Sequence, residues 1–190
     1  MTGRRAHPSP DGMSSREPAF LDRWRWWLPA LVGTVIVASA DQTTKLLILA
    51  TRPDVTLIPG FFSLTFGTNP GAAFGLFRSF PVVVTLLGIA VLLAILIYLG
   101  RGAHVMTGLE RVALTLVAGG ASGNTIDRLR LGYVVDYLDF YVGSYHWPAF
   151  NLADSAISVG AMLLAASTLR RGAAQTEPTS AKRRSEADVP

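Results

Sequence analysis

Four apolar stretches alternate with polar segments along the chain, and their lengths predict membrane-spanning helices. The clearest is 79–100, with 22 residues and no charge. About 20 apolar residues suffice for a helix to cross the hydrocarbon core of a bilayer. The stretches 26–40, 112–126 and 155–169 each hold 15 uncharged residues. A helix of that length reaches only about 22 Å across a core of about 30 Å, so each must extend into the polar residues beside it.

An aspartate interrupts each of the three shorter stretches. Asp41 and Asp127 follow the first and third stretches, and Asp154 precedes the fourth. Because successive spans alternate in direction, all three carboxylates are expected at the same membrane face. The pattern predicts an all-α integral membrane protein with one four-helix domain over 26–169. Its expected spans are about 26–48, 79–100, 108–127 and 151–169.

The segments outside the spans have different compositions. Residues 1–25 and 170–190 are polar and are expected to be disordered tails. In the first loop, β-branched and aromatic residues around Pro59-Gly60 predict two short strands, a small extracytoplasmic β element. The second loop, 128–150, is aromatic and polar, and no strand is predicted there. Ala38-Ser39-Ala40 imitates a signal-peptide cleavage site, but the apolar pattern continues past it, so the first stretch is expected to remain as a span.

The distribution of basic residues predicts the orientation. With both termini and the 101–111 loop on one side, that side holds 12 Lys and Arg and the other holds 5. By the positive-inside rule the termini are cytoplasmic and the aspartates lie near the outer face.

Composition narrows the function classes. Charged residues are 16% of the chain, against about a quarter in soluble domains. The net charge of +4 comes from basic residues at the ends of apolar runs, which does not suggest a nucleic-acid partner. There is no cysteine, which excludes disulfides, thiolate metal sites and cysteine nucleophiles.

Ionisable residues in membrane spans are costly and indicate function by default. Asp41 and Lys45 are spaced i, i+4, and we interpret them as a pair that neutralises itself near the interface. Gly120 lies in a glycine-rich run that lets helices approach closely, next to a polar face of the same helix. That face carries Asn124, Asp127 and Arg128.

Two further carboxylates form the candidate catalytic pair. Asp136 is expected in the second loop, and Asn151 and Asp154 begin the fourth span one turn apart. The 17 residues between Asp136 and Asp154 allow the two carboxylates to meet at the mouth of the bundle. Two acids that share a site do not both ionise, so one can take a proton from water while the other polarises a carbonyl. No metal or other cofactor is required.

Five segments resemble the signature segments of the lipoprotein signal peptidases, the bacterial signal peptidase II family, and occur in that family's order. They are D-Q-T-T-K (41–45), N-P-G-A-A-F (69–74), G-G-A-S-G-N-T-I-D-R (119–128), G-Y-V-V-D (132–136) and F-N-L-A-D (150–154). The resemblance covers about residues 28–169.

The resemblance implies an aspartic endopeptidase of the bacterial inner membrane. It would remove signal peptides from diacylglyceryl-modified prolipoproteins, cutting before the lipidated cysteine, with Asp136 and Asp154 as the catalytic pair. Asn69 and the polar residues named above would support the site. The expected partners are lipidated prolipoproteins and membrane phospholipids, and a monomer is the expected state.

Three alternatives compete with this reading. Gly120-Ala121-Ser122-Gly123 satisfies the GxSG pattern of rhomboid serine proteases, but the serine lacks a histidine base in a span. A small proton-coupled transporter using buried aspartates would need polar groups along a path through the membrane. A binding protein for lipidated chains without activity is the third, and the complete carboxylate set argues against it.

Overall fold

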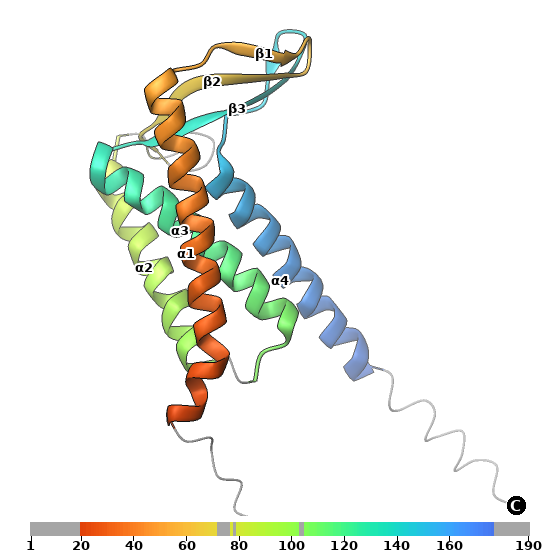
Figure 1. The fold of residues 1–190 in the computed structure, drawn as a ribbon. Helices are drawn as coiled ribbons and strands as arrows, with labels where there is room; N and C mark the ends of the chain where they lie inside the picture. The colour runs from red at the N-terminus through yellow and green to blue at the C-terminus, as the bar shows by residue number, and fades with distance from the viewer. Residues whose placement is uncertain (1–19, 72–76, 78, 103–104, 177–190) are drawn as a thin grey trace, which may run out of the picture.

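The computed structural model describes residues 20–71, 77, 79–102 and 105–176, and it shows a mostly helical protein with a small antiparallel sheet, as expected from the sequence (Figure 1). The helices are α1 (Phe20–Thr51), α2 (Pro81–Gly102), α3 (Gly108–Leu131) and α4 (Leu152–Thr176). The strands are β1 (Val55–Ile58), β2 (Phe62–Asn69), β3 (Val134–Val142) and β4 (Tyr145–His146).

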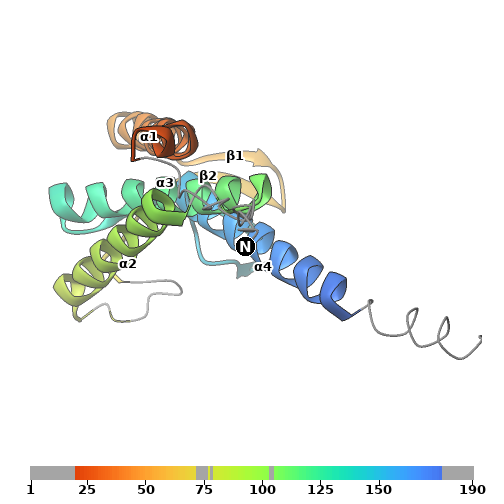
Figure 2. The same cartoon turned by 90° about the horizontal axis from the view of Figure 1, so that it is seen from below.

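Three helices in the described part of the chain are long and apolar enough to cross a membrane. They are Trp27–Thr51, Pro81–Gly102 and Leu152–Ala173. The third expected span, in α3, is not among them, because its C-terminal half carries several polar and charged side chains. α3 packs against all three other helices, and Figure 2 shows it between α1 on one side and α2 and α4 on the other. Its polar groups are therefore largely enclosed by protein.

Glycines in α3 permit this packing. A Cβ at Gly123 would collide with the carboxylate of Asp41, and one at Gly120 would collide with the carbonyl oxygen of Ala153. The absence of side chains at these two positions lets α1 and the first turn of α4 lie directly against α3.

The sheet lies at one end of the bundle, beyond the C-terminal end of α1 and the N-terminal end of α4 (Figure 1). Its strand order is β1-β2-β3-β4, with antiparallel neighbours. β1 and β2 form the hairpin expected around Pro59-Gly60. β2 pairs with β3 so that Gly67 lies opposite Asp136.

The second loop differs from the expectation, because it contributes β3 and β4 to the sheet. α3 ends at Leu131 and is capped by Gly132, a left-handed residue (φ 80°) whose N–H donates to the Arg128 carbonyl at 3.0 Å. The chain then enters β3, where Val134 and Val135 are buried. Asp136 therefore lies in a strand and is 5% exposed, not in an open loop.

The first and last helices of the chain, α1 and α4, are longer than the predicted spans. α1 begins at Phe20, within the predicted tail of residues 1–25, and α4 continues to Thr176, past the predicted end at 169. A helix satisfies its backbone groups internally, so it can continue beyond its apolar stretch until the sequence breaks it. The remaining residues of both tails lie outside the described part of the chain.

Candidate active site

Four aspartates from four elements gather where the sheet meets the bundle. Asp41 comes from α1, Asp127 from α3, Asp136 from β3 and Asp154 from α4. The first three are almost fully buried, and Asp154 is half-buried. A network of hydrogen bonds and ion pairs joins all four.

Lys45 is the buried cation of this network. Its Nζ lies 2.9 Å from Asp41 Oδ2 and 3.0 Å from Asp127 Oδ2, and it donates to Asn124 Oδ1 at 2.8 Å. The Lys45 side chain is 1% exposed, and its two acidic partners are equally enclosed. The i, i+4 pair expected on one helix is thus a three-charge cluster that joins α1 to α3.

The same two aspartates hold the backbone beside the candidate catalytic pair. Asp41 Oδ1 accepts from the N–H of Ala153 at 2.9 Å, one residue before Asp154. Asp127 Oδ2 accepts from the N–H of Val135 at 3.0 Å, one residue before Asp136. Charge-assisted bonds of this kind are short and strong. The Lys45 cluster therefore fixes the backbone next to both carboxylates.

Asn151 bridges the candidate pair at the start of α4. Its Nδ2 donates to Asp136 Oδ1 at 2.7 Å, and its Oδ1 accepts from the N–H of Asp154 at 2.9 Å. Asp154 Oδ2 in turn accepts from the N–H of Asn151 at 3.3 Å. This reciprocal arrangement has the geometry of a capping box with an aspartate at the third helical position. One amide side chain thus contacts both aspartates.

Asn124 holds the other carboxylate oxygen of Asp154. Its Nδ2 donates to Asp154 Oδ1 at 2.7 Å, and its Oδ1 accepts from Lys45 and, at 3.3 Å, from Asn151. The orientation of the amide is therefore determined on both sides. Asn124 links the cationic cluster to the candidate pair.

Asp136 has a strongly perturbed acidity. Burial, and after it the nearby charge of Asp154, raise the pKa of Asp136 to about 7. Hydrogen bonds from Asn151 and Asn69 and the charge of Lys45 oppose this rise. A carboxyl group with a pKa near neutrality can exist in both protonation states at physiological pH, as acid–base catalysis requires.

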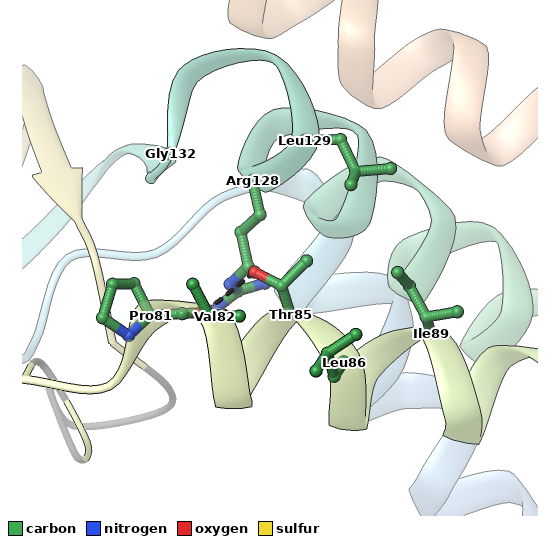
Figure 3. Close-up of a pocket in the computed structure, with 8 residues that line it drawn as sticks. All are labelled: Pro81, Val82, Thr85, Leu86, Ile89, Arg128, Leu129 and Gly132. Atoms are coloured by element: carbon green, nitrogen blue, oxygen red, sulfur yellow. Dashed lines mark hydrogen bonds between the residues drawn. The ribbon is translucent and has the colours of Figure 1, made fainter.

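Arg128 lies at the edge of the site and lines a groove between α2 and α3. Its guanidinium donates to the carbonyl oxygens of Gly71 at 2.8 Å and Asn124 at 3.3 Å. Its Nε is buried and has no hydrogen-bond partner among the described residues. Figure 3 shows the Arg128 side chain reaching from α3 towards α2, close to Val82 and Thr85. The rest of the groove is lined mainly by apolar side chains.

Asn69 ends β2, opposite Val134 at the start of β3. Its Oδ1 accepts from the N–H of Gly71 at 3.0 Å, the residue whose carbonyl receives Arg128. Asn69 therefore shapes the turn that follows β2. The structure thus brings together all the predicted polar site residues, with Gly120 packed beneath the first turn of α4.

Gln42 belongs to this network and was not singled out from the sequence. Its Nε2 donates to Asp127 Oδ1 at 2.9 Å and to the Gly123 carbonyl at 3.0 Å, and its Oε1 accepts from Arg130 at 3.0 Å. Its position between Asp41 and Lys45, in a helix expected to cross the membrane, is a sequence signal that could have identified it.

Ser122 and His146, which a serine-protease mechanism could use, bind to groups outside the aspartate cluster. Ser122 Oγ donates to the Ala118 carbonyl of its own helix at 2.8 Å. His146 Nδ1 lies 2.9 Å from Asp139 on the exposed side of the sheet. His7 and His104 lie outside the described residues. Within the described ranges, no group of three His, Cys, Asp or Glu side chains is arranged to hold a metal ion.

Comparison with known proteins identifies the family. The family model described as signal peptidase (SPase) II matches residues 33–170. This chain belongs to the signal peptidase II family. It is 46% identical over 149 residues to a lipoprotein signal peptidase of Burkholderia mallei (strain SAVP1), across 75% of this chain and 89% of that protein. A lipoprotein signal peptidase of Desulforapulum autotrophicum is 45% identical over 137 residues, across 68% of this chain and 84% of that protein.

Solved structures resemble the fold as well. Two bacterial membrane enzymes superpose with TM-scores of 0.70 and 0.63, at 31% and 32% sequence identity. They cover 78% and 74% of this chain, and the match spans 92% of each. The chain is thus a membrane-embedded peptidase of the signal peptidase II family, and its cluster of aspartates is the candidate active site.

Proposed function

We propose that this signal peptidase II family member is an aspartic endopeptidase with Asp136 and Asp154 as its catalytic pair. The observation that carries the proposal is the Asn151 side chain, which donates to Asp136 and accepts from the backbone of Asp154. It holds two carboxyl groups from different elements at one site. The raised pKa of Asp136 supports a pair that shares a proton.

In the proposed reaction the ionised carboxylate takes a proton from a water molecule as the water oxygen attacks the scissile carbonyl carbon. The protonated carboxyl group donates its proton to the carbonyl oxygen, which gives a neutral tetrahedral diol. Collapse of this diol breaks the C–N bond: the protonated carboxyl group gives its proton to the leaving nitrogen, and the ionised carboxylate takes a proton from one diol hydroxyl, whose oxygen becomes the new carbonyl oxygen. One proton remains on the pair afterwards, so the site returns to its starting state.

The proposed substrates are diacylglyceryl-modified prolipoproteins, cut before the lipidated cysteine. The names of the relatives and the membrane-embedded fold support this substrate class. The groove between α2 and α3 offers apolar side chains with the Arg128 guanidinium near one end. A substrate with hydrocarbon chains next to a peptide backbone would suit both kinds of surface.

The proposed setting is the bacterial inner membrane. Four spans would place both termini in the cytoplasm and the aspartate site near the outer face, with the sheet outside the hydrocarbon core. α3 would also span the membrane, although it is the least apolar of the four helices, because the other three pack against it (Figure 2). The protein would act as a monomer in contact with membrane phospholipids.

Incubation of the purified protein with a diacylglyceryl-modified precursor tests the proposal. Asp136→Asn and Asp154→Asn should each abolish release of the signal peptide while the protein stays folded. A positioned acid–base group contributes roughly 10²–10⁴-fold, and the double variant should be scarcely worse because the two groups act as one unit.

Asp139→Asn is the matched control. Asp139 lies on the same strand but contacts the exposed His146, and its loss should leave cleavage intact. If Asp139→Asn abolished cleavage while Asp136→Asn stayed active and folded, the assignment of the catalytic pair would be wrong.

A further inference from the structure

Tyr137 directly follows Asp136 in β3 and joins three elements through one hydroxyl. Its side chain is buried, and its ring packs with Ile48. The hydroxyl accepts from the N–H of Leu152 at 3.3 Å and donates to Thr44 Oγ1 at 3.0 Å. A strand, the first helix and the start of the last helix therefore meet at this phenol.

The other hydrogen bonds of Thr44 determine that the Tyr137 hydroxyl is the donor in its bond to Thr44 Oγ1. Thr44 Oγ1 donates its single proton to a backbone carbonyl, that of Asp41 at 2.8 Å. It must then accept the proton of Tyr137, which leaves the lone pairs of the phenol for the N–H of Leu152. A single chain of donors runs from α4, through Tyr137 and Thr44, to the backbone of α1 beside Asp41.

The N–H of Leu152 needs this acceptor because it belongs to the first turn of α4. N–H groups of a first helical turn have no partner within the helix. The N–H groups of the next two residues are bound by Asp41 and by Asn151. Tyr137 supplies the acceptor for Leu152, so each of these three donors in the turn that carries Asp154 has an acceptor of its own.

We propose that Tyr137 is a positioning residue, whose hydroxyl fixes the first turn of α4 and thereby sets Asp154 against Asp136. The inference rests on the proposed aspartic mechanism. Tyr137 is one residue from Asp136, and its hydroxyl binds the chain two residues before Asp154. Its backbone is also bound to the segment that leads into α4, because the Tyr137 N–H donates to the Phe150 carbonyl at 3.0 Å. The phenol therefore acts on the spacing of the two carboxyl groups through the backbone at the start of α4.

Tyr137→Phe tests this role, because it removes the hydroxyl and keeps the buried ring. A displacement of about 1 Å at a reacting group can cost about 10²-fold in rate, and the loss of one long hydrogen bond should cost about tenfold. We expect kcat for a diacylglyceryl-modified precursor to fall about tenfold with KM nearly unchanged. The pH profile should also shift, because the interaction between the two carboxyl groups depends on their separation.

Tyr141→Phe is the matched control on the same strand. Its hydroxyl lies 3.3 Å from Ser63 Oγ in the sheet, and its removal should leave kcat and the pH profile as they are. Thr44→Val removes the next link in the chain of donors and should reproduce the Tyr137→Phe defect. The double variant should be no worse than Tyr137→Phe alone, since both substitutions break one chain.

The outcomes separate this inference from the proposed function. Wild-type kcat and an unshifted pH profile in Tyr137→Phe, whether or not the protein melts earlier, would overturn the positioning role and leave the aspartic mechanism standing. If Tyr137→Phe did not fold, the same readings on Thr44→Val would decide. Activity in Asp136→Asn would instead overturn the mechanism on which the inference rests.

Discussion

At the scale of single residues, the site depends on how a few buried charges are compensated. Lys45 faces two aspartates, so its cluster carries an excess negative charge that hydrogen bonds from Gln42 and from backbone N–H groups stabilise. Asp136 has amide donors instead of a directly paired cation. Burial then dominates and raises the pKa of Asp136, because a charged carboxylate is disfavoured away from water.

The raised pKa of Asp136 predicts a pH-dependent stability. In the unfolded chain Asp136 ionises near its usual pKa of about 4, whereas in the folded protein it ionises at about 7. The folded state binds the extra proton between these values, so this contribution to stability is present below about pH 4 and is lost as the pH rises to about 7. The Asp136→Asn variant has no carboxyl group at this position, so its stability lacks this dependence on pH. Its melting temperature relative to wild type should rise from about pH 4 to pH 7 in detergent.

The charged groups near Asp136 are Asp154, Lys45 and Arg128, and the amides of Asn151 and Asn69 bind it. The Asp139→Asn variant serves as the control, because it removes a carboxylate from the same strand outside this set. A difference in melting temperature between Asp136→Asn and wild type that stayed constant from about pH 4 to pH 7 would contradict the raised pKa.

Removal of Lys45 tests the buried charge cluster. Lys45→Met leaves Asp41 and Asp127 facing each other without their cation, and breaking a buried pair costs roughly 3–5 kcal/mol, less near the membrane interface. We expect a clearly lower melting temperature in detergent. Arg130→Met removes an exposed cation that contacts Gln42 and should change stability by less than about 1 kcal/mol. Equal melting of Lys45→Met and wild type would show that the cluster does not stabilise the fold.

At the scale of secondary-structure elements, α3 is the helix on which the site is assembled. It contributes Asn124, Asp127 and Arg128, and its glycines bring α1 and α4 into contact with it. Its N-terminal end is also tied to α4, since Glu110 lies 2.7 Å from Arg171 and accepts from Ser167 at 3.3 Å. Both ends of the α3–α4 pair are therefore fixed.

Because α3 packs closely at its glycines, a single added methyl group should lower both stability and activity. Gly120→Ala places a Cβ against the Ala153 carbonyl and the side chain of Ile157, and should push the first turn of α4 away. Overpacking of this kind costs about 1–3 kcal/mol, so we expect lower melting temperature and weaker cleavage. Gly100→Ala in α2 is the control, because a Cβ there meets nothing within 4 Å. Wild-type activity and melting in Gly120→Ala would contradict the observed contact.

The sequence predicted the helical elements and the β1–β2 hairpin better than it predicted β3. A strand is recognised by alternating apolar and polar residues. In β3 the four residues from Val134 to Tyr137 are all buried, so this alternation is absent. The burial of Asp136 was missed for the same reason. Most candidate polar residues could be found by type and spacing, and Asn69 through the resemblance to the family. The bonds from Val135 and Ala153 could not be found, because backbone donors leave no mark in a sequence.

At the scale of the whole molecule, the apolar surface indicates which helix faces lipid. α2 is highly apolar, and little of it is buried within the protein. Exposed large hydrophobic side chains run along it, including Val82, Leu86 and Val91. Such a surface is suited to lipid.

The 12-to-5 distribution of Lys and Arg predicts that both termini are cytoplasmic. Reporter fusions after residues 60 and 140 should report an extracytoplasmic location, and a fusion after residue 105 a cytoplasmic one. A fusion at the C-terminus should also report a cytoplasmic location. If that fusion were extracytoplasmic, the four-span topology would be wrong.

The Lys45 cluster also constrains the order in which the helices can enter the bilayer during synthesis. α1 emerges first, and the i, i+4 spacing of Asp41 and Lys45 allows the two charges to pair within one helix before any other helix is made. Asp127 arrives two helices later and finds its cation on α1. We therefore expect α3 to leave the insertion machinery next to α1 and not alone, because by itself it would carry Asp127 into lipid without Lys45.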